Sequence, residues 1–414
     1  MLGREAPISV EKARALLLQH APFQRTAEIY LAIEDSYGMI TSRDIFSSEN
    51  LPSFSRSTVD GYAVNSADTF GAGETLPAYL HIKAEIFMGE KPGFVLAKGE
   101  VARIATGGML PEGADAVLMS EHTHQIDETM IESVNTVSPG ENVIQAGEDA
   151  RENDIISRSG HTLRPQDIGA LSGLGITQVW VYEKPRVSII LTGDEIVPAD
   201  RAVNPGQVRD INSYTLSGLI RDAGGVPLKK GIFRDEYDII RNAVKGSLET
   251  SEMVLITGGT SVGIKDMTAQ VINEMGAPGV LFHGVAIKPG KPIIGGVVQG
   301  IPVFGLPGHP AAVHVCFSIF IRPVLSIIAG SGEERLQEMK RTIQARISRD
   351  VSSSPDREEH IGVTLEERDG ELWAVPILGK SGLITALTKA DGTAVIPLMK
   401  LGIHKGELVT VRLF

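Results

Sequence analysis

Residues 253–266, MVLITGGTSVGIKD, join an apolar run to a glycine-rich loop and then to a helical pattern. A short apolar run rich in β-branched residues is typical of a strand buried on both faces. Strand-like and helical patterns alternate over the surrounding sequence: the strand-like runs lie at 187–192, 226–231 and 302–306, and the helical patterns at 213–223, 235–249 and 266–275. This alternation predicts a doubly wound α/β domain with a parallel sheet and helices on both faces.

The rest of the 414 residues lacks this regular alternation of strand and helix patterns. Residues 47–143 and 332–414 carry short, alternating strand signals, which predict an inserted β-rich domain and a small C-terminal β-domain. Residues 1–46 and 144–182 carry helix and strand signals that would form one domain split by the insertion. The sequence therefore predicts a multidomain α/β plus β protein, with 183–331 as the central domain.

Composition excludes several classes of protein. The formal charge of −12 argues against a large nucleic-acid surface, because phosphate binding on that scale needs a basic face. Cys316 is the only cysteine, which excludes disulfides and fits a reducing cytoplasm. The apolar run at 311–328 is broken by His314 and Ser318, so no membrane span is expected, and the N-terminus has the spacing of a surface helix, not of a signal peptide.

Unusual residues follow two of the predicted strands, where ligands of an open α/β sheet bind. LTGDEI (191–196) places Asp194 and Glu195 after a buried strand, although either carboxylate would also serve to cap a turn. TGGTSVGIKD (257–266) is a near miss to a phosphate-binding P-loop, since Ile264 separates Gly263 from Lys265. Its amides and hydroxyls would cradle an oxyanion and Asp266 would hold a hard cation, although the stretch alone would also fit a simple turn.

Two rigid loops follow further along the chain. AIKPGKP (286–292) holds Lys288 and Lys291 between prolines and a glycine, so that both charges lie on a stiff backbone. GLPGHP (305–310) places His309 at the cap of the next helix and a proline at the first helical position. We expect the two loops to converge on one anion.

The N-terminal half has weaker signals. Asp60 lies in PSFSRSTVDGYAV (52–64), and Thr106 and Asp149 lie in glycine-rich stretches at 105–117 and 146–154. The stretch at 52–64 also fits a simple turn, with Asp60 and Gly61 as the turn pair, and each of the three signals is weak by itself.

Eight motifs in this order closely resemble the molybdopterin molybdenumtransferase family, which comprises MoeA proteins and the gephyrin E-domain: PSFSRSTVDGYAV, TGGMLPEGADAV, GED, TGDEI, GGTSVGIKD, VAIKPGKP, GLPGHP and SGLITALTKADG. The resemblance covers nearly the whole chain. It implies a central domain like that of the MogA-type adenylyltransferase partner and a C-terminal β-barrel. It also implies an elongated homodimer, whose cleft combines the inserted domain of one subunit with the last two domains of the other.

The resemblance implies a transferase of molybdenum cofactor biosynthesis that inserts molybdate into adenylylated molybdopterin and releases AMP with the help of Mg²⁺. It implies contacts with the molybdopterin adenylyltransferase and with acceptor molybdoenzymes. Charge and hydropathy predict no nucleic-acid or membrane partner. Asp60, Thr106 and Asp149 match family positions important for activity, and Glu195, Asp235 and Asp266 are the expected metal carboxylates, also counted as catalytic. The expected substrate-binding residues are Gly258, Gly259, Ser261, Gly263, Lys288, Lys291, Pro307, Gly308, His309, Arg357 and Ser381.

Four residues depart from the family pattern. His309 replaces an asparagine, Ala312 a serine, His360 an aromatic residue and Gly362 an arginine. These departures leave two alternatives open: a member of the family selective for tungstate, which has nearly the size and charge of molybdate, and a scaffold that binds pterin without turnover. Retention of Asp235, Asp266, Lys288 and Lys291 argues against the scaffold.

Overall fold

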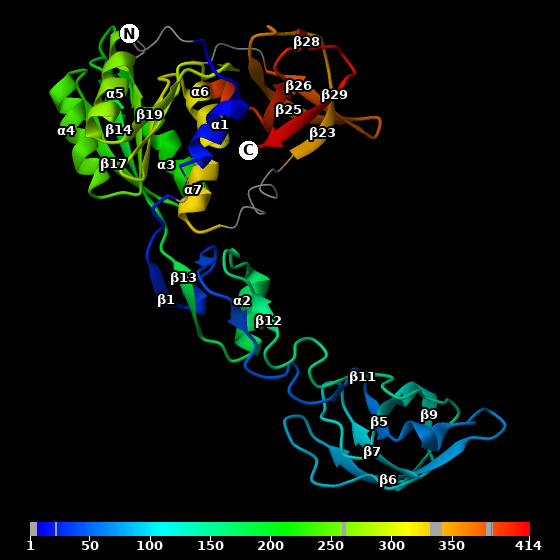
Figure 1. Ribbon diagram of the computed structural model, residues 1–414. Helices are drawn as coiled ribbons and strands as arrows, with labels where there is room; N and C mark the ends of the chain where they lie inside the picture. The colour runs from blue at the N-terminus through cyan, green and yellow to red at the C-terminus, as the bar shows by residue number, and fades with distance from the viewer. Residues whose placement is uncertain (1–5, 21–22, 259–261, 332–341, 378–381, 383) are drawn as a thin grey trace.

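The computed structural model describes residues 6–20, 23–258, 262–331, 342–377, 382 and 384–414, and of residues 262–266 the backbone alone. Figure 1 shows an elongated molecule. The doubly wound domain and the C-terminal domain lie side by side at one end, the split domain lies in the middle, and the inserted domain lies at the far end.

The doubly wound domain is built on a six-stranded sheet in the order β17-β14-β18-β22-β21-β19. Its strands are β17 (Val226–Phe233), β14 (Arg186–Thr192), β18 (Met253–Gly258), β22 (Ile301–Leu306), β21 (Ile294–Val298) and β19 (Pro278–His283). The first four are parallel, as predicted, but β21 is antiparallel to both of its neighbours. The four strands identified from the sequence are thus parallel, and β21, which the sequence did not identify, makes the sheet mixed at this edge. The cause is a two-residue hairpin at Gln299 and Gly300, whose φ angles of 51° and 83° are those of a type I′ turn.

Helices cover both faces of this sheet, because neighbouring residues of its strands point to opposite sides. Ile189 belongs to the core on one face and Ile190 to the core on the other. The helices of the domain are α3 (Asn212–Asp222), α4 (Tyr237–Leu248), α5 (Val262–Met275), α6 (Pro310–Cys316) and α7 (Arg322–Ile328), with a π-helical segment, Phe317–Ile321, between the last two. Pro323 lies two residues beyond this segment, in the first turn of α7, where a missing N–H is tolerated.

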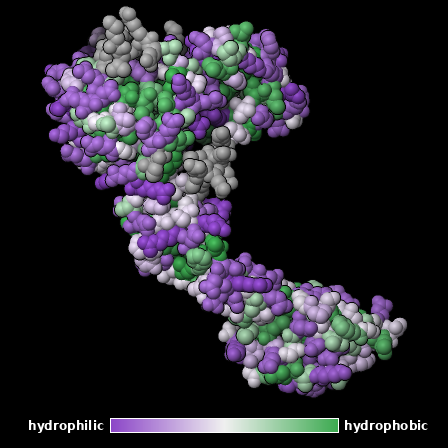
Figure 2. All heavy atoms as spheres, viewed as in Figure 1, coloured by the Kyte–Doolittle hydropathy of each residue, from purple (hydrophilic) through white to green (hydrophobic). Residues whose placement is uncertain are grey.

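The stretch Pro310–Ile328 is long and apolar enough to cross a membrane by length and composition, but 67% of its most apolar window is buried inside the protein. The stretch therefore forms a helical part of the core of this domain. Figure 2 shows hydrophilic residues, with apolar ones interspersed, over the visible face of the molecule.

The first helix, α1 (Val10–Leu18), packs on the doubly wound domain (Figure 1). Its Ala13 and Leu17 are buried in the same core as the strands of the central sheet. This placement differs from the predicted assignment of residues 1–46 to the split domain. Sequence periodicity identifies an apolar helix face, but not the domain that covers it.

The split domain pairs segments from both of its pieces. Its three-stranded sheet has the order β1-β13-β2, and short antiparallel pairs β3–β12 and β4–β11 lead toward the inserted domain. The elements are β1 (Glu28–Ala32), β2 (Ile40–Thr41), β3 (Ile45–Phe46), β4 (Arg56–Ser57), β11 (Val143–Ile144), β12 (Ile155–Ser157), α2 (Pro165–Gly173) and β13 (Gln178–Tyr182). These pairings agree with an insertion.

The inserted domain is a six-stranded sheet in the order β8-β5-β7-β6-β10-β9. Its strands are β5 (Gly61–Val64), β6 (Ala78–Ile86), β7 (Glu100–Ile104), β8 (Ala116–Met119), β9 (Thr123–Gln125) and β10 (Met130–Ser133). Two apolar clusters, one around Leu118 and the other around Ile104, form its core.

The C-terminal domain is a closed five-stranded barrel, since the sheet β25-β26-β23-β29-β27 is completed by pairing of β25 with β27. Its strands are β23 (Thr342–Ile347), β25 (Glu358–Arg368), β26 (Glu371–Pro376), β27 (Gly392–Ile396) and β29 (Leu408–Leu413), and β24 (Val351–Ser352) pairs with β28 (Gly402–Ile403) beside them. A short strand of the central domain, β20 (Ile287–Lys288), adds in parallel to β25. The barrel is thus joined to the loop that carries the predicted lysines.

Candidate functional site

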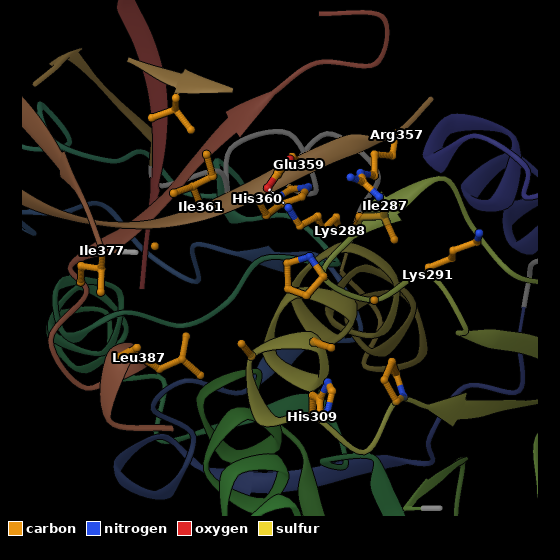
Figure 3. A pocket seen from close by; sticks show the side chains of 18 of the residues that line it. Ile287, Lys288, Lys291, His309, Arg357, Glu359, His360, Ile361, Ile377 and Leu387 are labelled. Carbon is orange, nitrogen blue, oxygen red and sulfur yellow. Dashed lines mark ion pairs between the residues drawn. The ribbon is translucent and has the colours of Figure 1, made fainter. Parts of the chain in front are cut away.

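A pocket of about 980 Å³ lies where the doubly wound domain meets the barrel. The AIKPGKP loop contributes Lys288 and Lys291 to its lining, the GLPGHP loop contributes Pro307, Gly308 and His309, and the barrel contributes Arg357, Glu359 and His360. In Figure 3, Lys288, Glu359 and His360 lie together, whereas His309 approaches from a different loop and the Lys291 side chain points away from Lys288. The two predicted loops meet in one pocket, while their roles in binding stay a prediction.

The GLPGHP loop is anchored by side chains from neighbouring elements. Asn212, at the start of α3, donates from Nδ2 to the Gly308 carbonyl at 2.9 Å, and the Thr257 hydroxyl donates to the Pro307 carbonyl at 3.2 Å. His309 is the N-cap of α6, as predicted, but its side chain makes no capping hydrogen bond. Asn212 and Thr257 therefore position the loop, and the His309 imidazole does not cap the helix.

The AIKPGKP loop is held between the barrel and α6. Gly290 has a φ of 123°, and a Cβ at this position would approach the Cys316 sulfur to 2.7 Å. Burial raises the pKa of the Cys316 thiol, which accordingly packs as an apolar group. The backbone of this loop therefore lies directly against α6.

Polar side chains at the start of β25 line the barrel wall of the pocket. Arg357 donates from Nη2 to the Ser354 hydroxyl at 3.1 Å, while its Nε is buried without a hydrogen-bond partner. His360 is bonded through Nε2 to Glu358 at 2.7 Å. Burial raises the pKa of Glu358, but the hydrogen bond with His360 and the positive charges nearby, those of Arg412 and Arg14 included, outweigh it and lower that pKa overall. Among the described residues the buried Nε of Arg357 has no acceptor, and an anion would supply one.

Carboxylates gather at the carboxyl ends of β14 and β17. The Oδ1 of Asp235 is buried and has no hydrogen-bond partner among the described residues. Burial raises the pKa of Asp235, and the negative charges of Asp194 and Glu195 raise it further.

A hard cation would relieve this arrangement, because it prefers carboxylate oxygens and would neutralise their repulsion. Asp235 and Glu195 thus fit Mg²⁺ by donor type. Within the described part of the chain, however, no three His, Cys, Asp or Glu side chains are grouped closely enough to hold a metal. The third predicted ligand, Asp266, belongs to α5, and its side chain lies outside the described residues.

The other loop of this sheet edge begins at Gly258. Its φ is 140°, and a Cβ there would lie 1.7 Å from the Thr192 carbonyl oxygen, so only glycine fits between the two strand ends. Of the remaining predicted residues, Gly259, Ser261 and Ser381 lie outside the described residues, and Gly263 is described only as backbone of α5. The helix starts at Val262, earlier than the predicted 266.

The three predicted residues of the N-terminal half lie away from the pocket. Thr106 donates from its backbone N–H and its hydroxyl to Asp60 Oδ1, at 2.7 and 2.8 Å, and these bonds lower the pKa of Asp60. Asp149 is exposed and donates its N–H to the Leu51 carbonyl. Figure 1 shows the inserted domain at the opposite end of the chain from the barrel. A single chain therefore does not bring these residues to Lys288.

Comparison with known proteins identifies the family. Residues 8–175 match the model of the MoeA N-terminal region (domains I and II), 188–326 that of a probable molybdopterin binding domain, and 344–414 that of the MoeA C-terminal region (domain IV). A putative molybdopterin biosynthesis protein of Methanocaldococcus jannaschii is 34% identical over 92% of this chain and 91% of its own. The chain belongs to the MoeA family, that of the molybdopterin molybdenumtransferases.

Other members agree in sequence and in shape. The molybdopterin molybdenumtransferase of Bacillus subtilis is 30% identical over 100% of this chain and 95% of its own. A solved molybdopterin biosynthesis MoeA protein of Pyrococcus horikoshii superposes with a TM-score of 0.84 at 29% identity, covering 99% of this chain and 100% of its own. The MoeA architecture, with a MogA-like central domain and a C-terminal barrel, is therefore confirmed.

The four departures from the family pattern all line the pocket: His309, Ala312, His360 and Gly362. Three residues of the site were not identified from the sequence. Asn212 positions Gly308, Glu358 pairs with His360, and Glu359 pairs with Lys288. Glu359 lies two residues after Arg357 in the sequence, but only the pairing of β20 with β25 places it opposite Lys288.

Proposed function

We propose that this transferase of molybdenum cofactor biosynthesis inserts molybdate into adenylylated molybdopterin with Mg²⁺-dependent release of AMP. The pocket between the doubly wound domain and the barrel would hold the oxyanion. The observation that carries the proposal is the buried Nε of Arg357, a charged donor without an acceptor in a pocket that also contains Lys288 and Lys291. A tetrahedral dianion offers the acceptors that such donors require.

The residues at the sheet edge have a separate task. Asp235 and Glu195, with Asp266, would hold Mg²⁺, and the orphaned Oδ1 of Asp235 supports this assignment. Bound there, the ion would neutralise negative charge that develops on the phosphates as the anhydride is cleaved.

Asp60, Thr106 and Asp149 would reach a pocket only in a second copy of the chain. Their distance from the barrel in Figure 1 supports an elongated homodimer in which the inserted domain of one copy completes the site of the other. Contacts with the molybdopterin adenylyltransferase and with acceptor molybdoenzymes, and a cytoplasmic location, form part of the same proposal.

The test is AMP release from adenylylated molybdopterin by the purified protein. Molybdate plus Mg²⁺ should release AMP, and chelation of the Mg²⁺ should abolish the release. Tungstate in place of molybdate measures oxyanion selectivity. Binding of the pterin without AMP release in either oxyanion would contradict the enzyme and favour the scaffold.

A further inference from the structure

The predicted oxyanion ligand Lys288 already has an anionic partner. Its Nζ lies 2.6 Å from Glu359 Oε1, and the second carboxylate oxygen of Glu359 accepts a hydrogen bond from the Ser353 hydroxyl at 2.8 Å. The ion pair follows from the fold, since β20 and β25 pair in register with Lys288 opposite Glu359. The pocket therefore carries its own acid beside the lysine (Figure 3).

The two partners differ in freedom of movement. The Glu359 side chain is 10% exposed and fixed by Ser353, whereas the Lys288 side chain is 51% exposed. A lysine stem has several rotatable bonds, so the ammonium is able to turn toward a ligand while the carboxylate stays in place. An anion entering the pocket thus meets Lys288 with Glu359 still beside it.

We propose that Glu359 competes with the oxyanion for Lys288 and thereby sets a low affinity of the pocket for a free tetrahedral dianion. This inference rests on the proposed function, in which Lys288 binds molybdate. An oxyanion that contacts Lys288 either displaces the carboxylate, leaving a buried charge without its cation, or shares the ammonium with a like charge a few ångströms away. Either route weakens binding.

The competition also determines which groups attract an oxyanion into the pocket. Lys288 and Glu359 neutralise one another, so the net attraction for a dianion comes from the remaining cationic groups. Arg357 is one of these groups, and its buried Nε has no hydrogen-bond partner among the described residues. Firm retention of the oxyanion then requires several contacts at once, not Lys288 alone.

The test is Glu359→Gln, which keeps the size of the side chain and an amide oxygen for Ser353 but removes the charge. Equilibrium dialysis against molybdate, with bound molybdenum measured by mass spectrometry, needs no pterin and no turnover. The variant should bind molybdate about tenfold more tightly, which is about 1.4 kcal/mol, because screening limits the worth of partly exposed charge pairs. Sulfate, as a competitor of the same shape and charge, should gain similarly.

Glu367→Gln is the matched control, because it changes the same charge on an exposed part of β25 and should leave the dissociation constant unchanged. In a Lys288→Gln background, the gain from Glu359→Gln should shrink to about threefold or less, since the contested cation is gone. Equal or weaker binding by Glu359→Gln would overturn the competition. Tighter binding without AMP release would instead leave the competition intact and count against the proposed function.

Discussion

His314 lies at the contact between the two domains that form the pocket, and its protonation should weaken that contact. Its ring packs edge-on against Phe414 at the end of the barrel, with centroids 4.3 Å apart. The pKa of His314 is lowered from 6.5 to about 4, mainly by burial and also by the positive charge of Arg322, while the negative charge of Asp222 partly opposes both. The folded protein thus keeps this imidazole neutral.

The size of the effect follows from linkage between proton binding and folding. Between pH 6.5 and pH 4 the unfolded chain takes up a proton at His314 that the folded chain does not, so stability is lost as the pH falls through this window. One pKa unit corresponds to about 1.4 kcal/mol, and the loss should reach about 2.5 kcal/mol by pH 4.5.

Hydrogen exchange of the α6 amides measures this loss locally. After correction for intrinsic rates, protection in the wild type should fall between pH 7 and pH 4.5 by about 50-fold more than in His314→Gln, which has no group titrating there. His124→Gln, an exposed histidine of the inserted domain, should behave as the wild type. An equal fall in the wild type and in His314→Gln would refute the assignment.

Two further substitutions test the sheet edge. Gly258→Ala should destabilise the doubly wound domain by at least about 3 kcal/mol in urea unfolding, because the added Cβ would overlap the Thr192 carbonyl and the φ of residue 258 is unfavourable for alanine. The control Gly246→Ala, which adds a methyl group in open space in α4, should stabilise the domain slightly. Equal effects of the two substitutions would contradict the reasoning. Burial and then Asp194 raise the pKa of Asp235, so ionising this carboxylate lowers stability as the pH rises through that pKa. Asp235→Asn should therefore raise the metal-free melting temperature near pH 7, modestly because the group is partly exposed, and abolish stabilisation by Mg²⁺. Full Mg²⁺ stabilisation in this variant would exclude Asp235 as a ligand.

The alternation of strands and helices predicted the central domain because each buried strand reads as an apolar run regardless of its neighbours. Strand direction is not contained in such runs. The pair β21–β22 reverses at Gln299 and Gly300, and a turn of only two residues without Asn or Asp gives a weak signal. The placement of α1 on the central domain likewise depends on tertiary contacts.

The pocket was partly predictable because stiff loops follow strands that end at one edge of the sheet. Lys288 and His309 stood out by their proline and glycine neighbours. Asn212 and Glu359 did not, because each acts through a partner distant in the sequence: Asn212 through Gly308, and Glu359 through the register of β20 on β25. Such pairings are set by packing of whole domains, which local patterns do not encode.

The central claim is that the pocket between the doubly wound domain and the barrel binds the oxyanion. Crystals of the protein soaked in molybdate and measured at the molybdenum absorption edge test it directly. The account predicts an anomalous peak in this pocket, within contact of Lys288 and Arg357, that disappears in Arg357→Met. A pocket without such a peak, with molybdenum bound elsewhere on the chain, would contradict it.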